Sequence, residues 1–270
     1  MKAHALNTLV AVVLTGVSGS VLADAPPGAL GTTDQYELGV QALDYQYKEP
    51  GLMSNKGSKF GLTAGFAKRL DGWNLSGEAR FATGNVNYNG SGTMSGKPDR
   101  LWEFRLVAGE DYAFESFGLT PYAGVGYRTL FNDLRGFSST GMRGYRRYSE
   151  YLYIPIGLTH RFQAGDDGRL STSLEFDYLA YGNQKSALSD TQVGLSDPVN
   201  KQRKGYGLRL SSTYEAPNWS LGVFYNYWNI RDSDTSRLSF FGVPTNVIVW
   251  EPKNNTNEFG LQLKYRLPGM

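Results

Sequence analysis

The sequence predicts an all-β protein, a ten-stranded antiparallel transmembrane β-barrel. Apolar and polar residues alternate with a period of two in segment after segment, which is typical of strands with one apolar face. The connections between these segments are alternately short and long. The composition agrees: the 270 residues include 18 Tyr and 33 Gly, which suits strands joined by many turns, and no Cys.

The last segment shows the alternation most clearly. Its apolar positions are Phe259, Leu261, Leu263, Tyr265 and Leu267, and its polar positions are Glu258, Gly260, Gln262, Lys264 and Arg266. In a transmembrane barrel the apolar face meets lipid and the polar face lines the interior. The same pattern recurs in residues 60–67, 73–81, 102–108, 151–161, 169–178 and 206–215, and less regularly in 36–47, 119–130 and 219–229. The sequence therefore predicts ten strands.

The connections separate a membrane barrel from a soluble β-sandwich. The short ones are residues 71–72, 115–118, 164–168 and 217–218. The long ones are residues 48–58, 84–100, 132–146, 183–204 and 231–257. Bacterial barrels have an even number of strands, short periplasmic turns and long outside loops. We therefore expect both termini in the periplasm and five loops outside.

The N-terminus predicts export. Lys2 precedes an apolar run from Ala5 to Val17, and Val21-Leu22-Ala23 ends in a small residue before Asp24. This arrangement is typical of a cleaved secretory signal. We expect a signal peptide over residues 1–23, a loose periplasmic leader over 24–33 and the barrel over 34–270.

Two segments carry a resemblance to known proteins. Thr120-Pro-Tyr-Ala-Gly-Val-Gly-Tyr127 and Tyr151-Leu-Tyr-Ile-Pro-Ile-Gly157 resemble strands of the small outer-membrane β-barrel superfamily of Gram-negative bacteria. The resemblance implies a location in the cell outer membrane and insertion by the barrel assembly machinery. Such barrels often end on an aromatic residue, whereas this chain ends Pro268-Gly269-Met270.

Charged residues at interior positions are the main candidate site. The predicted lumen-lining residues are Glu78, Arg80, Glu103, Arg105, Arg128, Glu175, Asp177, Arg209, Glu215 and Lys264, with Arg266 at the same parity. Charges in a narrow barrel must be paired or hydrated. They therefore either plug the lumen or line a thin aqueous pore. Eight strands leave an interior that side chains fill, so ten strands favour the plugged alternative.

Catalysis has little support. Outer-membrane enzymes resemble one another in using a histidine, and this chain has only His4, in the signal segment, and His160. His160 lies on the same face of its predicted strand as Ile156 and Leu158, so it should face lipid near the periplasmic rim. We predict no catalytic site, no cofactor and no His or Cys metal site. A calcium site at Asp232 and Asp234 is a weak alternative.

The predicted outside loops are basic. Arg135, Arg143, Arg146 and Arg147 belong to one of them. Because guanidinium groups bind phosphate bidentately, we predict that these four residues bind an anionic ligand such as lipopolysaccharide; the equal alternative is an ordinary solvated loop. The apolar stretch Leu238–Trp250 predicts a hairpin turning at Val243-Pro244-Thr245; the alternatives are a lid folded over the lumen and an apolar surface for a partner. No block of like charge indicates a nucleic-acid partner.

The predicted function is a non-enzymatic outer-membrane barrel with a scaffold or surface-interaction role. The alternative is a narrow porin-like channel for ions or small solutes, lined by Arg80, Glu103, Arg105, Glu175 and Arg209. A lipid-modifying enzyme is the third and least favoured hypothesis.

Overall fold

The computed structural model describes residues 30–70 and 73–268, which are built from strands. No helix in these two ranges is long and apolar enough to cross a membrane. The predicted signal peptide, the predicted turn at 71–72 and the last two residues lie outside the described residues.

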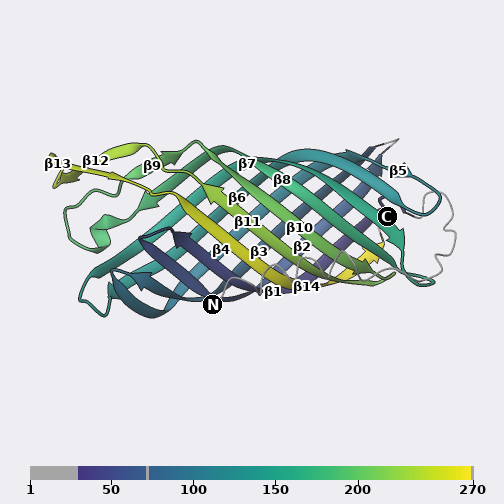
Figure 1. The fold of residues 1–270 in the computed structure, drawn as a ribbon, viewed down its shortest axis with the longest axis horizontal. Coiled ribbons are helices and arrows are strands. Elements are labelled where there is room, and N and C mark those ends of the chain that lie inside the picture. Colours follow the sequence, from purple (N-terminus) through teal and green to yellow (C-terminus); the bar gives the residue numbers. More distant parts are fainter. Residues whose placement is uncertain (1–29, 71–72, 269–270) are drawn as a thin grey trace.

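Ten long strands pair antiparallel and close into a barrel (Figure 1). They are β1 (Gln35–Glu49), β2 (Met53–Leu70), β3 (Trp73–Gly90), β4 (Gly92–Glu110), β6 (Gly118–Phe137), β7 (Arg143–Gln163), β8 (Arg169–Ser186), β10 (Gly205–Glu215), β11 (Trp219–Ile230) and β14 (Asn254–Pro268). Each pairs with its neighbour along the chain, and β14 closes the ring by pairing with β1. The predicted fold and strand number are confirmed.

Five smaller elements mark the two ends of the barrel. They are β5 (Tyr112–Ala113), the 3-10 helix η1 (Leu188–Asp190), β9 (Val199–Gln202), β12 (Thr235–Phe240) and β13 (Val243–Trp250). We call the end with β5 the turn end and the end with β9, β12 and β13 the loop end; they lie at opposite ends of the long axis (Figure 1).

The strands continue well past the length that a membrane requires. β6 has 20 residues and β7 has 21, whereas about 9–11 residues span a bilayer. The prediction of a long loop at 48–58 is therefore wrong, because only residues 50–52 separate β1 from β2. Likewise only Ser91 separates β3 from β4. Beyond the bilayer the outward face meets water, so the apolar alternation stops although the strand does not.

The outward face of the turn-end half of the barrel is apolar, as predicted, and we call this surface the apolar wall. Leu38 is 61% exposed and Phe60 67% exposed, and neighbouring outward positions carry Leu62, Phe104 and Ile156. In solution so much exposed apolar surface would be unstable, whereas in a bilayer it contacts acyl chains.

Candidate functional site: the barrel interior

All ten predicted lumen-lining side chains lie on inward-facing positions of their strands. Nine charged groups form a continuous ion-pair lattice across the middle of the barrel. They are Glu78, Arg80, Glu103, Arg105, Arg128, Glu175, Asp177, Arg209 and Glu258. The other two predicted residues, Glu215 and Lys264, lie closer to the turn end.

The lattice joins strands on opposite sides of the barrel. Arg209 on β10 reaches across the lumen to Glu103 on β4, with Nη1 3.2 Å from Oε2, and Arg80 Nε lies 2.5 Å from the same oxygen. Glu258 pairs with both Arg80 and Arg128 and is fully buried. Since each buried charge has an opposite charge beside it, the penalty for removing it from water is offset.

Sequence reasoning missed several further ion-paired charged groups in the interior, among them Glu258, Lys59 and Asp99. Glu258 has interior parity but was not included among the predicted site residues. Lys59 and Asp99 form a fully buried pair with Nζ 2.5 Å from Oδ1. Asp99 falls in the segment that was predicted as the loop 84–100, so the sequence pattern gave no reason to place it inside a barrel.

The loop-end half of the lumen is filled by side chains. Buried polar and charged residues such as Lys59, Asp99 and Arg147 lie there beside a cluster of apolar and aromatic side chains, which we call the plug. It consists of Leu43, Tyr45, Tyr47, Ala82, Val86, Leu101, Leu130, Tyr151, Tyr153, Leu179, Phe224, Trp228 and Ile230. Trp228 is 2% exposed and packs against Tyr151 and Tyr153. With the ion-pair lattice beneath it, the plug closes the barrel interior on the loop side.

The plug arises because the apolar residues of β1 change sides along the strand, from outward-facing positions to inward-facing ones. Near the turn end, Leu38 and Val40 point outward, but beyond Gln41 the inward residues are Leu43, Tyr45 and Tyr47. Outside the bilayer the outer face contacts water, so apolar residues are more stable inside the barrel. A change of phase within one strand is therefore the sequence signal that could have revealed the plug.

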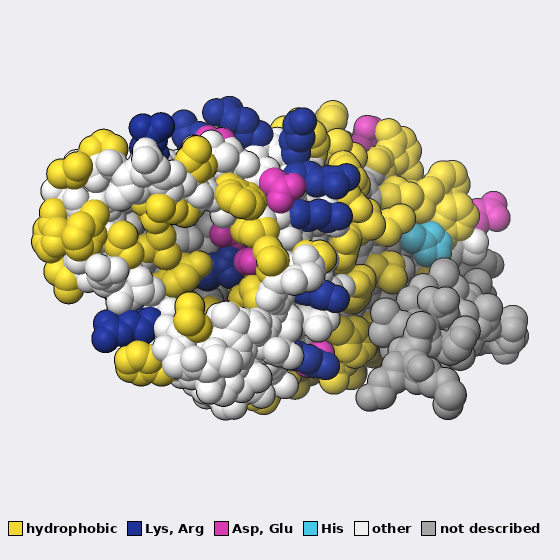
Figure 2. All heavy atoms as spheres, turned by 60° about the vertical axis from the view of Figure 1, so that its left-hand side comes forward, with side chains coloured by type: hydrophobic (Ala, Val, Ile, Leu, Met, Phe, Trp, Pro, Cys, Tyr) yellow, Lys and Arg dark blue, Asp and Glu magenta, His cyan; other side chains and the backbone are white. Residues whose placement is uncertain are grey.

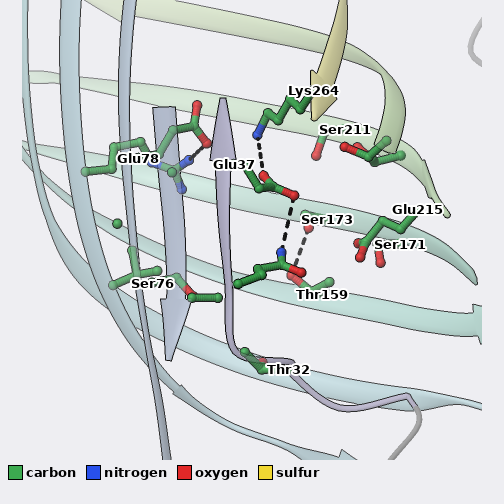
Figure 3. Close-up of a pocket in the computed structure, with 18 of the residues that line it drawn as sticks. Thr32, Glu37, Ser76, Glu78, Thr159, Ser171, Ser173, Ser211, Glu215 and Lys264 are labelled. Atoms are coloured by element: carbon green, nitrogen blue, oxygen red, sulfur yellow. Dashed lines mark hydrogen bonds and ion pairs between the residues drawn. The ribbon is translucent and has the colours of Figure 1, made fainter. Parts of the chain in front are cut away.

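A polar cavity of about 270 Å³ occupies the turn-end half of the lumen. Serine and threonine hydroxyls from several strands face it, including Ser76, Thr159, Ser171, Ser173 and Ser211 (Figure 3). Its charged groups are paired: Lys264 Nζ lies 3.1 Å from Glu37, and Arg169 lies 2.7 Å from Glu215. Toward the loop end the cavity stops at the lattice residues Arg80, Arg105 and Arg209.

The residues just before β1 cross the turn end of the barrel. Leu30 is buried, and the Thr32 backbone N–H and hydroxyl donate to Asp111 at 2.9 and 3.0 Å. Arg169 on β8 donates to the Gly31 carbonyl at 2.7 Å. Asp111 and Arg169 lie across the strand order from β1. Residues 30–32 of the predicted loose leader are thus held against the opposite wall, beside the cavity.

The four arginines predicted to bind an anionic ligand do not form one cluster. Arg147 is buried and pairs with Glu49 and Glu251, so its prediction as an outside ligand-binding residue is wrong. It was assigned to a loop, but at its position on β7 the side chain points inward. Arg135 pairs with Asp133 at 2.6 Å, and Arg146 with Asp190 at 2.8 Å. Arg143 is exposed and donates to the Thr191 carbonyl.

The Arg146–Asp190 pair attaches η1 to β7, and we expect this contact to weaken in acid. Hydrogen bonds from Arg146 lower the pKa of Asp190 from its ordinary value. A lowered folded pKa means that the contact is complete above the unfolded value of about 3.9 and is lost as pH falls through the folded pKa. Hydrogen exchange at neutral pH should show weaker protection around η1 in Asp190→Asn than in wild type. Unchanged protection would contradict the role of this pair; Asp167→Asn, at an exposed position of the turn end, is the control.

His160 lies where its parity predicts, on the outward face of β7 near the turn end. Its ring packs against Phe117 and Phe162 at centroid distances of 5.5 and 5.7 Å. The described residues contain no group of three His, Cys, Asp or Glu side chains arranged to hold a metal ion.

Comparison with solved structures identifies the fold. The outer-membrane protease OmpT from Escherichia coli superposes with a TM-score of 0.57 at 13% identity, covering 88% of this chain and 98% of that one. This chain has the fold of a Gram-negative outer-membrane β-barrel. The predicted location in the outer membrane of a Gram-negative bacterium agrees with that fold and with the apolar wall.

Two other solved structures match at lower scores. An outer membrane channel from Pseudomonas putida F1 matches with a TM-score of 0.40 at 13% identity, over 90% of this chain and 99% of that one. The transport unit of the Escherichia coli autotransporter AIDA-I matches with a TM-score of 0.42 at 9% identity, over 96% and 97%. No protein-family model and no curated protein matches the sequence.

Proposed function

We propose that this protein is a closed, non-enzymatic outer-membrane barrel that serves as a scaffold for interactions at the cell surface. The observation that carries the proposal is the filled lumen: the plug and the lattice occupy its loop-end half and its middle. What the molecule presents outside is a rigid extension of its strands, which suits presentation of a surface better than passage of a solute.

The alternative of a narrow channel requires a continuous aqueous path. The turn-end cavity is polar, but Arg80, Glu103 and Arg209 are buried where it stops. Above them Leu101, Trp228 and Tyr153 exclude water. Ions crossing this region would have to lose their hydration among closely packed side chains, which costs several kcal/mol for each charge.

The absence of a catalytic role is also part of the proposal. His160 packs among aromatic rings on the lipid-facing wall, where no carboxylate is within ion-pair distance of it among the described residues. A histidine base needs a substrate and an orienting partner within hydrogen-bond reach. The similarity to a protease is one of fold at 13% identity, so it does not transfer the activity.

We further propose that outward cations hold the phosphates of outer-leaflet lipid, such as lipopolysaccharide. Lys48, Lys56 and Arg100 are exposed on the outer face just beyond the apolar wall. Within the described ranges none of the three has a carboxylate within 4.0 Å, unlike Arg135 and Arg146. Figure 2 shows Lys and Arg side chains gathered between the apolar wall and the loop end. These three residues replace Arg147 as the candidates for phosphate contact.

The closed lumen is tested by ion conductance. Purified wild-type protein in planar bilayers should give no steady single-channel current, because the plug leaves no aqueous path. Insertion is checked in the same preparation by protection of the strands from protease. Steady channels of reproducible size in the inserted wild-type protein would overturn the proposal in favour of a pore.

The phosphate contacts are tested by charge removal. The triple variant Lys48→Gln, Lys56→Gln, Arg100→Gln should retain fewer lipopolysaccharide molecules through purification, measured by native mass spectrometry, because three unpaired cations are lost. The matched control is Arg135→Gln, whose guanidinium already has a carboxylate partner. Equal retention by wild type and the triple variant would count against these residues.

A further inference from the structure

The hairpin β12–β13 is the outermost part of the loop end, and its turn differs from the predicted one. Phe240 pairs with Val243, so the turn residues are Phe241 and Gly242 rather than Val243-Pro244-Thr245. Both have positive φ, 47° and 80°, as a two-residue hairpin turn of this type requires. Pro244 therefore lies inside β13 rather than at the tip.

The two edges of this hairpin have different surroundings. The β12 edge is covered by the loop that precedes β9: Leu195 bridges to Phe240, and Ser196 N–H donates to the Ser239 carbonyl at 3.0 Å. For β13, the only described strand partner is β12. Two side-chain contacts to its backbone are found in the described residues: Asn200 donates to the Val249 carbonyl, and the Val247 N–H donates to the Thr245 hydroxyl at 3.2 Å. Most of the outer edge of β13 therefore presents unpaired backbone groups.

The open edge is apolar on both faces and carries no charge. Val247 and Ile248 are each 53% exposed although they point to opposite faces, and Trp250 is 54% exposed. Natural proteins protect exposed edges with charged residues or proline, and Pro244 gives that protection only near the turn. Residues 246–250 have neither, so this segment has the properties of a strand that accepts another strand.

A second strand suits this edge better than a bilayer does. Insertion into acyl chains would bury the unpaired N–H and C=O groups of β13, each at a cost of several kcal/mol. An added strand would instead satisfy those groups and cover apolar side chains on both faces. Because residues 246–250 lack charge, a second copy of the same segment meets no like-charge repulsion.

We propose that β13 pairs antiparallel with β13 of a second copy of this chain, with Ile248 opposite Ile248 of that copy. Such a two-fold pair places Val247 opposite Val249 and Asn246 opposite Trp250, which are favourable cross-strand contacts. Pro244 stays outside the paired segment. Arg237 lies on β12, which is the second strand from the contact in each copy. The two Arg237 side chains are therefore three strand spacings apart, roughly 14 Å, and salt screens their repulsion.

The direction of the hairpin determines where the second copy lies. The hairpin continues along the long axis of the barrel, away from the turn end (Figure 1). Antiparallel pairing then makes the two barrels point in opposite directions, so they belong to two facing membranes. This inference rests on the proposed surface-interaction function with the loop end outside. Five residues on each side form a small contact, so stable attachment requires many copies acting together.

The first test is a cross-linking experiment that uses the absence of cysteine in the chain. Outer-membrane vesicles carrying Ile248→Cys are prepared in unlabelled and ¹⁵N-labelled form and mixed under mild oxidation. A disulfide needs Cα atoms about 4.4–6.8 Å apart, which only directly opposed residues provide. We expect mixed-isotope dimers for Ile248→Cys and none for the β12 control Thr235→Cys. Dimers without mixed-isotope species, or no dimers, would overturn the pairing between facing membranes.

The second test is aggregation of the same vesicles, measured by light scattering. Val247→Lys adds a charge to the exposed edge, where a lysine opposes strand pairing, and should abolish aggregation. Val193→Lys adds the same charge at a 79% exposed position outside the hairpin and should leave aggregation unchanged. Aggregation that persists in Val247→Lys would overturn the proposal. Ion conductance does not depend on this edge, so the two experiments separate the two proposals. Wild-type protein that conducts no ions and whose vesicles do not aggregate contradicts only the strand pairing. Wild-type protein that conducts ions contradicts the proposed function.

Discussion

Asp99→Asn should destabilise the barrel by about 3–5 kcal/mol, because it leaves the buried Lys59 ammonium without a carboxylate. Lys59 is fully buried, and Asp99 is the one described acidic group within ion-pair distance of it. The carboxylate also accepts a hydrogen bond from Asn132 at 3.0 Å, which an amide replaces imperfectly. Guanidinium unfolding of protein refolded in lipid vesicles measures the change in the free energy of unfolding.

A double substitution separates the charge from the packing. Lys59→Met with Asp99→Asn removes both charges, and replacement of a buried ion pair by neutral groups is often nearly neutral in stability. The double variant should therefore be more stable than Asp99→Asn alone. Lys56→Met is the matched control, since Lys56 is an exposed lysine of the same strand, and it should have no effect beyond about 0.5 kcal/mol. A fully stable Asp99→Asn would show that the pair contributes little.

Removing the plug should convert the closed barrel into a channel. The variant Trp228→Ala, Tyr45→Ala deletes two of the largest buried side chains of the interior. Their loss leaves a space at the loop end that joins the outside water to the lattice. Each deletion should cost about 3–5 kcal/mol of stability, and the folded variant should give steady currents in planar bilayers where wild type gives none.

The same strand supplies the control for this variant. Trp219 lies on β11 with Trp228 but points outward and is 44% exposed. Trp219→Ala with wild-type Tyr45 should remain silent in bilayers. If the Trp228→Ala, Tyr45→Ala variant folds and is also silent, the ion-pair lattice alone closes the lumen and the plug serves only stability.

Sequence reasoning predicted the interior residues that lie within the bilayer and missed those that lie beyond it. Within the bilayer the solvent on the outer face is lipid, so apolar residues point outward and Glu103 or Arg209 can be assigned to the interior by counting. Beyond the bilayer the rule reverses, and Tyr45 and Tyr47 were not recognised as interior residues. Arg147 was assigned to an outside loop for the same reason, since no alternation marks the part of β7 to which it belongs.

Period-two alternation and the order of short and long connections were enough to determine the barrel, its ten strands and its lipid-facing wall. These features depend on local chain geometry and on which solvent each face meets, and both are encoded residue by residue. Only the tertiary structure decided the pairing of Lys59 with Asp99, the stacking of Trp228 on Tyr153 and the open edge of β13. Those contacts join strands that are far apart in the chain, and their formation depends on barrel closure, on the register of each pair and on where each strand leaves the membrane.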